Sequence, residues 1–394
     1  MTDVAAAITM EPGITTQREV GRWDTGLPGP TLMVTGALHG NEPAGIYAAQ
    51  RVLARLQEHA PQIRGRFLAL CGNLAALREG KRFLARDLNR SWDQESLTAT
   101  QALDEQDRSP EDNEQLELLQ CFVSAERTAS GPLVYVDMHT SSADGSPFLC
   151  LADTIDNRRL GLTTGVPIIL GIEETIAGAS LEWFADRGIL ALTIEGGQHD
   201  SDDAIANHEA VLWGLLVRLG MLPEGFVDLA PHRERLRQAV GTAPPVVEIL
   251  HRHVIAPDDA FRMEPGFLNF AKVAKGQLLA KDRGGEIRAK NKTHVMLPLY
   301  QELGDDGFFL ARRVRWFWLW LAKWLRALHV AALLPLMPGI RRDPHDHDTM
   351  LANPSVARWF VVEVFHLLGF RKVTERSGCR AFRRRSSRPE NRWL

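Results

Sequence analysis

Short apolar runs alternate with amphipathic stretches through the first 220 residues of this chain, and this alternation constrains its fold more than any other feature. Residues 44–57 and 208–220 carry apolar side chains at helical spacing. The runs typical of buried strands are 31–38, 66–72, 133–138, 166–171 and 189–194. Strands that alternate with helices predict an α/β layered domain with a mostly parallel sheet, which we assign to residues 1–243.

The pattern changes at Pro244-Pro245. Residues 246–311 contain short strand-like runs split by Gly and Pro turns, which predicts a small all-β domain over 244–311. The remaining residues, 312–394, carry 17 Lys and Arg against 6 Asp and Glu, although the whole chain has a net charge of −3. This asymmetry predicts a basic appendage on an acidic body.

The basic appendage begins with an apolar stretch, residues 316–337, in which Lys323, Arg326 and His329 recur at three-residue steps. Because a membrane-spanning helix needs about 20 residues without such charges, we expect an amphipathic helix. We favour its packing on the body or on a second subunit over contact with a membrane surface through 312–394. A second helix is expected over 355–370, and the last fifteen residues, rich in Arg, are expected to be disordered.

The cysteines and the N-terminus indicate the cellular compartment in which the chain is expected. Four scattered cysteines form no CxxC pair, which argues against a thiolate zinc site and against a disulfide framework. The opening residues have no basic stretch before an apolar run and do not resemble a signal peptide. We expect a cytoplasmic protein with no nucleic-acid partner, and we leave homo-oligomerisation open.

The first chemical cluster is His39-Gly40-Asn41-Glu42, directly after a predicted strand and before a predicted helix. Strand ends in an open α/β sheet are where ligand sites form. His39 and Glu42, three residues apart on a turn, can converge on one ion, because the intervening glycine frees the backbone. Imidazole nitrogen and carboxylate oxygen are standard zinc ligands.

The second cluster is Asp137-Met138-His139-Thr140, at the end of another predicted strand. His139 completes a set of two histidines and one glutamate, which leaves a further position open for water, as in catalytic zinc sites. Asp137 lies on the same side of the strand as His139 and is placed to orient a ligand. Non-haem iron sites also use two histidines and a carboxylate, so the ligand types alone do not fix the metal.

Two further segments are candidates for the same site. Residues 80–90 hold four basic side chains and are either a solvated loop or a device that recognises anions through its guanidinium groups. Glu195, followed by two glycines, ends the strand ILALTI. It suits a general base that faces a cleft, with a structural capping role as the alternative.

Together these segments resemble the succinylglutamate desuccinylase/aspartoacylase family, which is related to the zinc carboxypeptidases. The matching motifs, in order, are His39-Gly40-Asn41-Glu42, the stretch from Gly80 to Arg90, Asp137-Met138-His139-Thr140 and Glu195. The resemblance covers about residues 30–310. It implies a zinc carboxypeptidase-like α/β domain followed by a β-domain that shapes the substrate entrance. Residues 312–394 have no counterpart in the two enzymes that name the family.

The resemblance also implies roles for single residues. One zinc ion per chain is expected on His39, Glu42 and His139. Glu195 resembles the family's catalytic glutamate, and Arg82 the arginine that polarises the scissile carbonyl. Asn89 and Arg90 resemble the pair that binds a substrate carboxylate. Tyr300 is the nearest candidate for a tyrosine of the family's β-domain that contacts substrate.

The predicted function is zinc-dependent hydrolysis of the amide bond of a small N-acyl amino acid. The residues after Glu195 depart from the family's two named enzymes, so the acyl group and the amino acid stay open. The alternatives are a metallocarboxypeptidase acting on peptides and a catalytically silent metal-binding scaffold. A non-haem iron oxygenase is disfavoured, because the candidate ligands lie in an α/β pattern.

Overall fold

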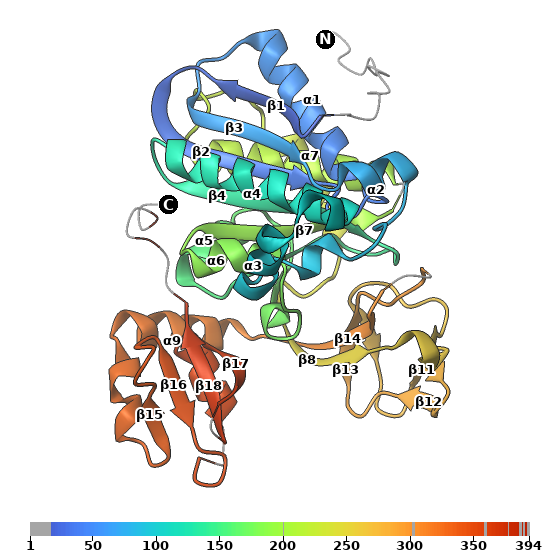
Figure 1. Cartoon of the computed structure of the whole chain (residues 1–394), viewed down its shortest axis with the longest axis vertical. Coiled ribbons are helices and arrows are strands. Elements are labelled where there is room, and N and C mark those ends of the chain that lie inside the picture. Colours follow the sequence, from blue (N-terminus) through green and yellow to red (C-terminus); the bar gives the residue numbers. More distant parts are fainter. Residues whose placement is uncertain are drawn as a thin grey trace.

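Three units make up the computed structural model of this chain (Figure 1), namely an α/β body, a small β unit and a C-terminal α/β unit. The structure describes residues 17–199, 201–301, 304–357, 361–376, 378–385, 388 and 391.

A mixed sheet runs through the body and continues into the small β unit, with strands in the order β1-β3-β2-β4-β7-β5-β6-β8-β14-β13-β10. Its central strands β3, β2, β4 and β7 are parallel, whereas β1 and β5 pair antiparallel with β3 and β7. The strands of the body are β1 (Glu19–Asp24), β2 (Leu27–Gly36), β3 (Arg64–Cys71), β4 (Leu133–Ser141), β5 (Phe148–Leu151), β6 (Ile168–Leu170) and β7 (Leu190–Gln198). The mostly parallel sheet predicted for the body is thus present, with antiparallel additions.

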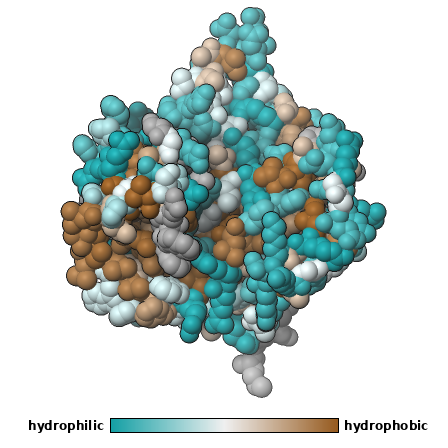
Figure 2. All heavy atoms as spheres, turned by 90° about the horizontal axis from the view of Figure 1, so that it is seen from below, coloured by the Kyte–Doolittle hydropathy of each residue, from teal (hydrophilic) through white to brown (hydrophobic). Residues whose placement is uncertain are grey.

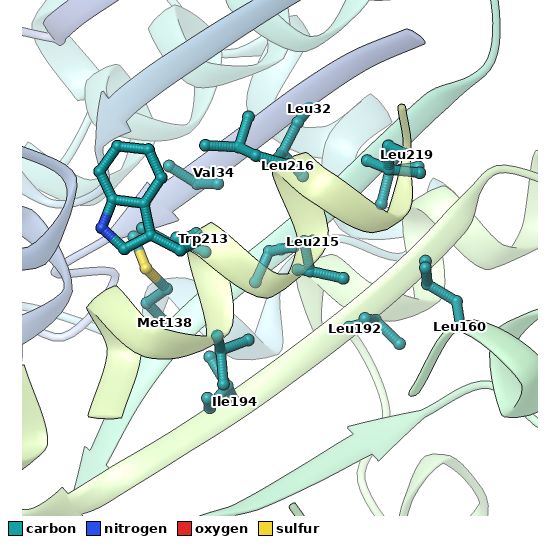
Figure 3. Close-up of a cluster of buried hydrophobic side chains, with 14 of the residues drawn as sticks. Leu32, Val34, Met138, Leu160, Leu192, Ile194, Trp213, Leu215, Leu216 and Leu219 are labelled. Atoms are coloured by element: carbon teal, nitrogen blue, oxygen red, sulfur yellow. The ribbon is translucent and has the colours of Figure 1, made fainter. Parts of the chain in front are cut away.

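Helices cover both faces of this sheet. One face packs against α1 (Ala44–His59) and α7 (Asp202–Arg218), whose contacts with β2 and β4 form the main apolar core around the buried Trp213 (Figure 3). The other face packs against α4 (Pro110–Thr128) and α6 (Ser180–Asp186). The remaining helical segments of the body are α2 (Leu74–Glu79), η1 (Leu88–Arg90), α3 (Gln94–Ala102), η2 (Glu105–Asp107), α5 (Ile155–Leu162), η3 (Ile172–Glu174) and α8 (Ala230–Val240).

The small β unit has its own apolar cluster but is not separate from the body's sheet. Strand β8 pairs parallel with β6 of the body and antiparallel with β14, so the main sheet runs across the expected boundary at 244. A second sheet has the order β12-β11-β9. The elements of the unit are β8 (Val246–Val254), η4 (Pro257–Asp259), β9 (Arg262–Met263), β10 (Ala271–Val273), β11 (Leu278–Asp282), β12 (Gly285–Arg288), β13 (Thr293–Met296) and β14 (Asp306–Arg313).

The C-terminal unit corrects the prediction of a helical extension, because it also contains a sheet. Of the last fifteen residues, for which we expected disorder, 386, 387, 389, 390 and 392–394 lie outside the described part of the chain. The unit contains a four-stranded antiparallel sheet in the order β15-β16-β18-β17, and β18 lies within the Arg-rich stretch for which we expected disorder. An apolar cluster around Phe365 and Phe382 packs β18 into this unit. The elements are α9 (Trp316–Ala327), η5 (Val330–Leu336), β15 (Ile340–Arg342), β16 (Thr349–Ala352), α10 (Val361–Leu367), β17 (Phe370–Arg376) and β18 (Cys379–Arg384).

The C-terminal unit is attached to the body by a buried ion network. Asp153 of the body, which is fully buried, accepts from Arg326 of α9 at 3.0 Å and from Arg371 of β17. Arg371 also pairs with Glu174 of η3 at 2.6 Å and lies 3.5 Å from Glu173. The network therefore ties the C-terminal unit to the short helix η3.

The expected helix over 316–337 is broken in two. His329 adopts a positive φ of 53°, which ends α9, and the axes of α9 and η5 differ by 80°. Within the described residues no unbroken helix has the length and apolarity to cross a membrane; only this bent pair passes that test when its two parts are taken together.

Candidate metal centre and active-site cavity

The candidate site lies at the carboxyl ends of three neighbouring strands. His39 and Glu42 follow β2, His139 lies near the end of β4, and Glu195 lies near the end of β7. The pairing of β4 with β7 sets His139 directly opposite Glu195. The sheet thus brings together residues that are more than 150 positions apart in the sequence.

The two histidines and Glu42 form a compact buried cluster. Ligand atoms of His39, Glu42 and His139 all lie within 4.8 Å of one another. Glu42 Oε1 is 2.9 Å from His39 Nδ1, and Glu42 Oε2 is 2.9 Å from His139 Nδ1. The structure therefore brings together the three predicted ligands.

The turn that carries His39 and Glu42 depends on Gly40 for a different reason from the one expected. A Cβ atom on Gly40 would lie 2.2 Å from the backbone of Ala76 in α2, so close packing rather than a left-handed φ requires glycine here. The Gly40 N–H donates to the Arg82 carbonyl at 3.1 Å, and the Glu42 N–H donates to the His39 carbonyl at 3.0 Å. These contacts fix the turn against the loop that follows α2.

Each histidine has a carboxylate on its outer nitrogen. His139 Nε2 lies 2.9 Å from Asp137 Oδ2, and His39 Nε2 lies 3.1 Å from Asp87 Oδ1. A carboxylate in this position holds the proton on Nε2 and leaves Nδ1 free to bind a cation. The orienting role predicted for Asp137 fits this geometry. The equivalent contact of Asp87 was not predicted.

The donor set fits a divalent metal ion. Burial alone would raise the pKa of Glu42, but the adjacent His39 and His139 outweigh it and hold the pKa well below its ordinary value. Glu42 is therefore an ionised carboxylate between two imidazole nitrogens, and this mixed set suits zinc as well as other first-row transition metals.

Glu195 is a buried carboxylate beside this cluster. Its Oε2 has no hydrogen-bond partner among the described residues. Burial raises the pKa of Glu195 to about 8. A carboxyl group with a pKa near neutrality, next to a candidate metal centre, suits a group that accepts and returns a proton.

Arg82 reaches into the same cavity from the loop after α2. Its Nη2 donates to Asp87 Oδ2 at 3.0 Å, and its Nη1 lies 3.5 Å from Glu42 Oε1. Burial would lower the pKa of Arg82, but Asp87 and Glu42 outweigh it and raise the pKa. A permanently charged guanidinium therefore lies beside the cluster.

The other basic side chains of residues 80–90 differ in whether they face the cavity. Arg90 lines the cavity and pairs with Asp306 of β14 at 3.3 Å, whereas Arg86 pairs with Asp112 of α4 at 2.6 Å. Lys81 is exposed and pairs with Glu79. Of the four basic side chains, only Arg82 and Arg90 are therefore placed to meet a ligand.

Asn89 contacts the candidate metal centre as well as the cavity. Its Nδ2 lies 3.3 Å from His139 Nε2, and its Oδ1 accepts from the Ser180 N–H at 2.8 Å. These contacts fix Asn89 between η1 and α6. The side chain predicted to bind substrate therefore also lies against the His139 ring.

Tyr300 does not line the cavity, in contrast to the expectation for a substrate-binding residue. Its hydroxyl donates to the Glu264 carbonyl and accepts from the Phe267 N–H, both at 2.9 Å. The neighbouring Gln301 faces the cavity instead and meets His199 Nε2 at 3.1 Å. Of these two neighbouring side chains, the one that faces the cavity is therefore the amide of Gln301.

The cavity has a volume of about 150 Å³ and a mixed lining. Besides the residues above, Glu173 of η3 and Glu182 of α6 line the cavity and add two carboxyl groups to its walls. Burial raises the pKa of both carboxyl groups. Sequence reasoning missed these residues and His199, because no motif marks them.

The fold and the site define an α/β protein with a candidate metal centre at the carboxyl edge of its sheet. Residues 28–201 match the family profile described as "Succinylglutamate desuccinylase/Aspartoacylase catalytic domain". The part of the chain that carries the candidate metal centre therefore belongs to the succinylglutamate desuccinylase/aspartoacylase family.

One relative is similar to this chain in sequence, and two solved structures are similar to it in fold. A succinylglutamate desuccinylase from Pseudomonas paraeruginosa is 27% identical over 282 residues, which cover 68% of this chain and 77% of the relative. The ectoine utilization protein EutE (DoeB) from Ruegeria pomeroyi shares the fold with a TM-score of 0.54 at 22% identity, over 74% of this chain and 87% of that chain. Murine aminoacylase 3 shares it with a TM-score of 0.51 at 19% identity, over 74% and 97%.

Proposed function

We propose that this chain is a zinc-dependent hydrolase that cleaves the amide bond of a small N-acyl amino acid. The observation that carries the proposal is the convergence of His39, Glu42 and His139 within 4.8 Å in a cavity that also contains the buried Glu195. Relatives named succinylglutamate desuccinylase and aminoacylase 3 support an amide substrate of this class.

Three residues would hold the metal through His39 Nδ1, His139 Nδ1 and the Glu42 carboxylate. When bound, zinc supplies Lewis acidity, which polarises a carbonyl and lowers the pKa of a coordinated water to about 7. Asp87 and Asp137 keep the two imidazole rings in the orientation that presents Nδ1.

Glu195 is the proposed general base. Its unpartnered Oε2 is available to take a proton from the attacking water and to return it to the leaving amine. Positive charge near the cluster favours the ionised form of Glu195 and so opposes the effect of burial on its pKa.

Arg82 and Arg90 are the proposed contacts to the substrate's charged oxygens. Arg82 lies beside Glu42, where it can donate to the oxyanion that forms as the carbonyl is attacked. Arg90 and Asn89 line the same cavity and are placed to bind a carboxylate, which would fix the amide relative to Glu195.

The size of the cavity favours a small substrate over a peptide. Its volume of about 150 Å³ lies below the roughly 300 Å³ at which pockets for larger ligands begin. Comparing kcat/KM for N-acetyl, N-succinyl and longer N-acyl amino acids with that for a peptide panel tests the proposal. Hydrolysis of one short N-acyl amino acid well above all peptides is expected. A preference for peptides would assign the chain to the metallocarboxypeptidases instead.

A further inference from the structure

Helix α9 presents an aromatic face that the described part of the chain leaves uncovered. We define this aromatic face as Trp316, Phe317, Trp320 and Trp324, which follow one another at helical spacing. Each side chain is between 49% and 58% exposed. Figure 2 shows hydrophobic side chains gathered at the left of the molecule, the side on which Figure 1 draws α9.

The opposite side of α9 fixes the helix to the protein. Ala322 is buried, Leu319 packs against the main core of the body, and Leu325 packs against the core of the C-terminal unit. Arg326 is anchored to Asp153 at 3.0 Å. The orientation of α9 is therefore set by buried contacts, and the aromatic face points outward as a consequence.

Basic side chains border the aromatic face. A groove of about 340 Å³ beside the helix is lined by Trp316, Trp320 and Lys323 together with Arg159 of α5, and no Asp or Glu of the described chain lines it. Arg158 also lines it, but its charge is paired with the buried Asp153. On the other side of α9, Arg312, Arg313 and Arg315 line a second groove with Trp318. Two glutamates also line this groove, namely Glu248, which pairs with Arg312 at 2.8 Å, and Glu363. Aromatic side chains within a basic border are typical of surfaces that lie in the interfacial layer of an anionic membrane.

We propose that the aromatic face of α9 binds the surface of a membrane that contains anionic lipids, with the helix lying along the surface. Indole rings favour this layer because they combine an apolar body with an N–H donor. The 80° bend between α9 and η5 agrees with a surface position. The exposed Leu333 and Leu336 of η5 would extend the apolar contact.

A second copy of the chain fits this surface less well. In a twofold-symmetric dimer the patch meets itself, so the cationic border of one subunit, which includes Lys323 and Arg159, would face the cationic border of the other. Juxtaposed like charges oppose such an interface, whereas anionic headgroups neutralise them. The charge pattern thus selects lipid over self-association.

Co-sedimentation of the full chain with vesicles tests the proposal. We expect binding to vesicles of equimolar phosphatidylcholine and phosphatidylglycerol, weak binding to pure phosphatidylcholine, and weaker binding as salt rises. The double variant Phe317→Ser/Trp320→Ser should bind at least about tenfold more weakly. Lys323→Glu, which keeps every aromatic ring, should lose at least about fivefold. Val123→Ser, at a similarly exposed apolar position on α4, should bind like the unchanged chain.

The oligomeric state, measured by analytical ultracentrifugation on the same samples, distinguishes membrane binding from self-association through the aromatic face. If the full chain does not co-sediment with anionic vesicles, the proposal is overturned. So does a chain that self-associates and is converted to monomer by Phe317→Ser/Trp320→Ser without binding vesicles, since a second copy would then cover the aromatic face. Equal binding to both kinds of vesicle would remove the role of the basic border and would also contradict the proposal.

Discussion

At the scale of single residues, the site rests on four carboxylates that have three different tasks. Glu42 lies between two imidazoles, Asp137 and Asp87 hold the outer nitrogens of these rings, and Glu195 keeps one oxygen unpartnered among the described residues. The environment of each carboxylate sets its role, because charge partners favour ionisation and burial opposes it.

Glu195→Gln tests the proton-transfer role. The amide has the same shape but cannot take a proton, so kcat for a hydrolysed N-acyl amino acid should fall by about 100-fold or more while bound zinc is retained. Steady-state kinetics and metal analysis on the same preparation measure both. Glu117→Gln, on the exposed side of α4, is the matched control. A kcat close to that of the unchanged chain would remove Glu195 from the mechanism.

Asp137→Asn tests the orienting contact to His139. Because the amide no longer fixes the ring through a charged hydrogen bond, zinc affinity should fall by about 10–100-fold, and Asp87→Asn should act likewise on His39. Competition with a chelating dye measures the affinity. Asp93→Asn, which keeps a side-chain cap on α3, should leave it unchanged. Equal affinities for all variants would show that these carboxylates serve packing alone.

The ligands could be predicted from the sequence, but several of their partners could not. His39, Glu42, His139 and Glu195 each follow an apolar strand, and such positions are visible in the sequence. Asp87 meets a histidine 48 residues away, and Gln301 meets His199 across 102 residues. Neither pair has a local pattern, since loop conformation brings each together.

At the scale of elements, η3 connects the cavity to the C-terminal unit. Glu173 of η3 lines the cavity, and both Glu173 and Glu174 contact Arg371 of β17. Glu174 and Glu248 of β8 also accept from His366 of α10, at 3.1 Å and 3.0 Å. One wall of the cavity is therefore supported from outside the family's catalytic domain.

Arg371→Met tests this support. It removes the buried cation that Asp153, Glu173 and Glu174 share. Asp153 keeps Arg326 and Glu174 keeps His366, but Glu173 loses its ion-pair partner, so the free energy of unfolding should fall by about 3–5 kcal/mol. Urea denaturation measures the change. The control Arg376→Met breaks a pair with Asp343 whose arginine is 51% exposed, and it should cost at most about 1 kcal/mol. Equal effects of the two substitutions would contradict a structural role of the network.

The pH dependence of stability tests His366. Burial would lower the pKa of His366, but Glu174 and Glu248 outweigh it and raise the pKa. A raised folded-state pKa contributes stability that is complete below the ordinary value of 6.5 and is lost as the pH rises through the folded-state value. Urea midpoints should therefore fall on the alkaline side, and His366→Gln should flatten that fall. If the urea midpoint of His366→Gln fell with pH as steeply as that of the unchanged chain, His366 would not be the group responsible.

At the scale of the whole molecule, the central strands of the body and helices α1 and α7 were predictable from the sequence. The antiparallel strands β1 and β5 and the joins between units were not. Apolar runs marked the central strands, yet β8 extends the body's sheet through its pairing with β6, which has only three residues. The C-terminal sheet was missed because its strands are short and rich in Arg. A small apolar core and ion pairs with the body hold these strands in place.

The central claim is that His39, Glu42 and His139 hold one metal ion. The zinc content of the purified full chain, measured by mass spectrometry after loading and desalting, tests it most directly. We expect about one zinc per chain, the same content in His251→Ala, whose exposed histidine lies outside the cavity, and none in His139→Ala. A folded His139→Ala variant that keeps its zinc, or an unchanged chain that binds none, would contradict the account.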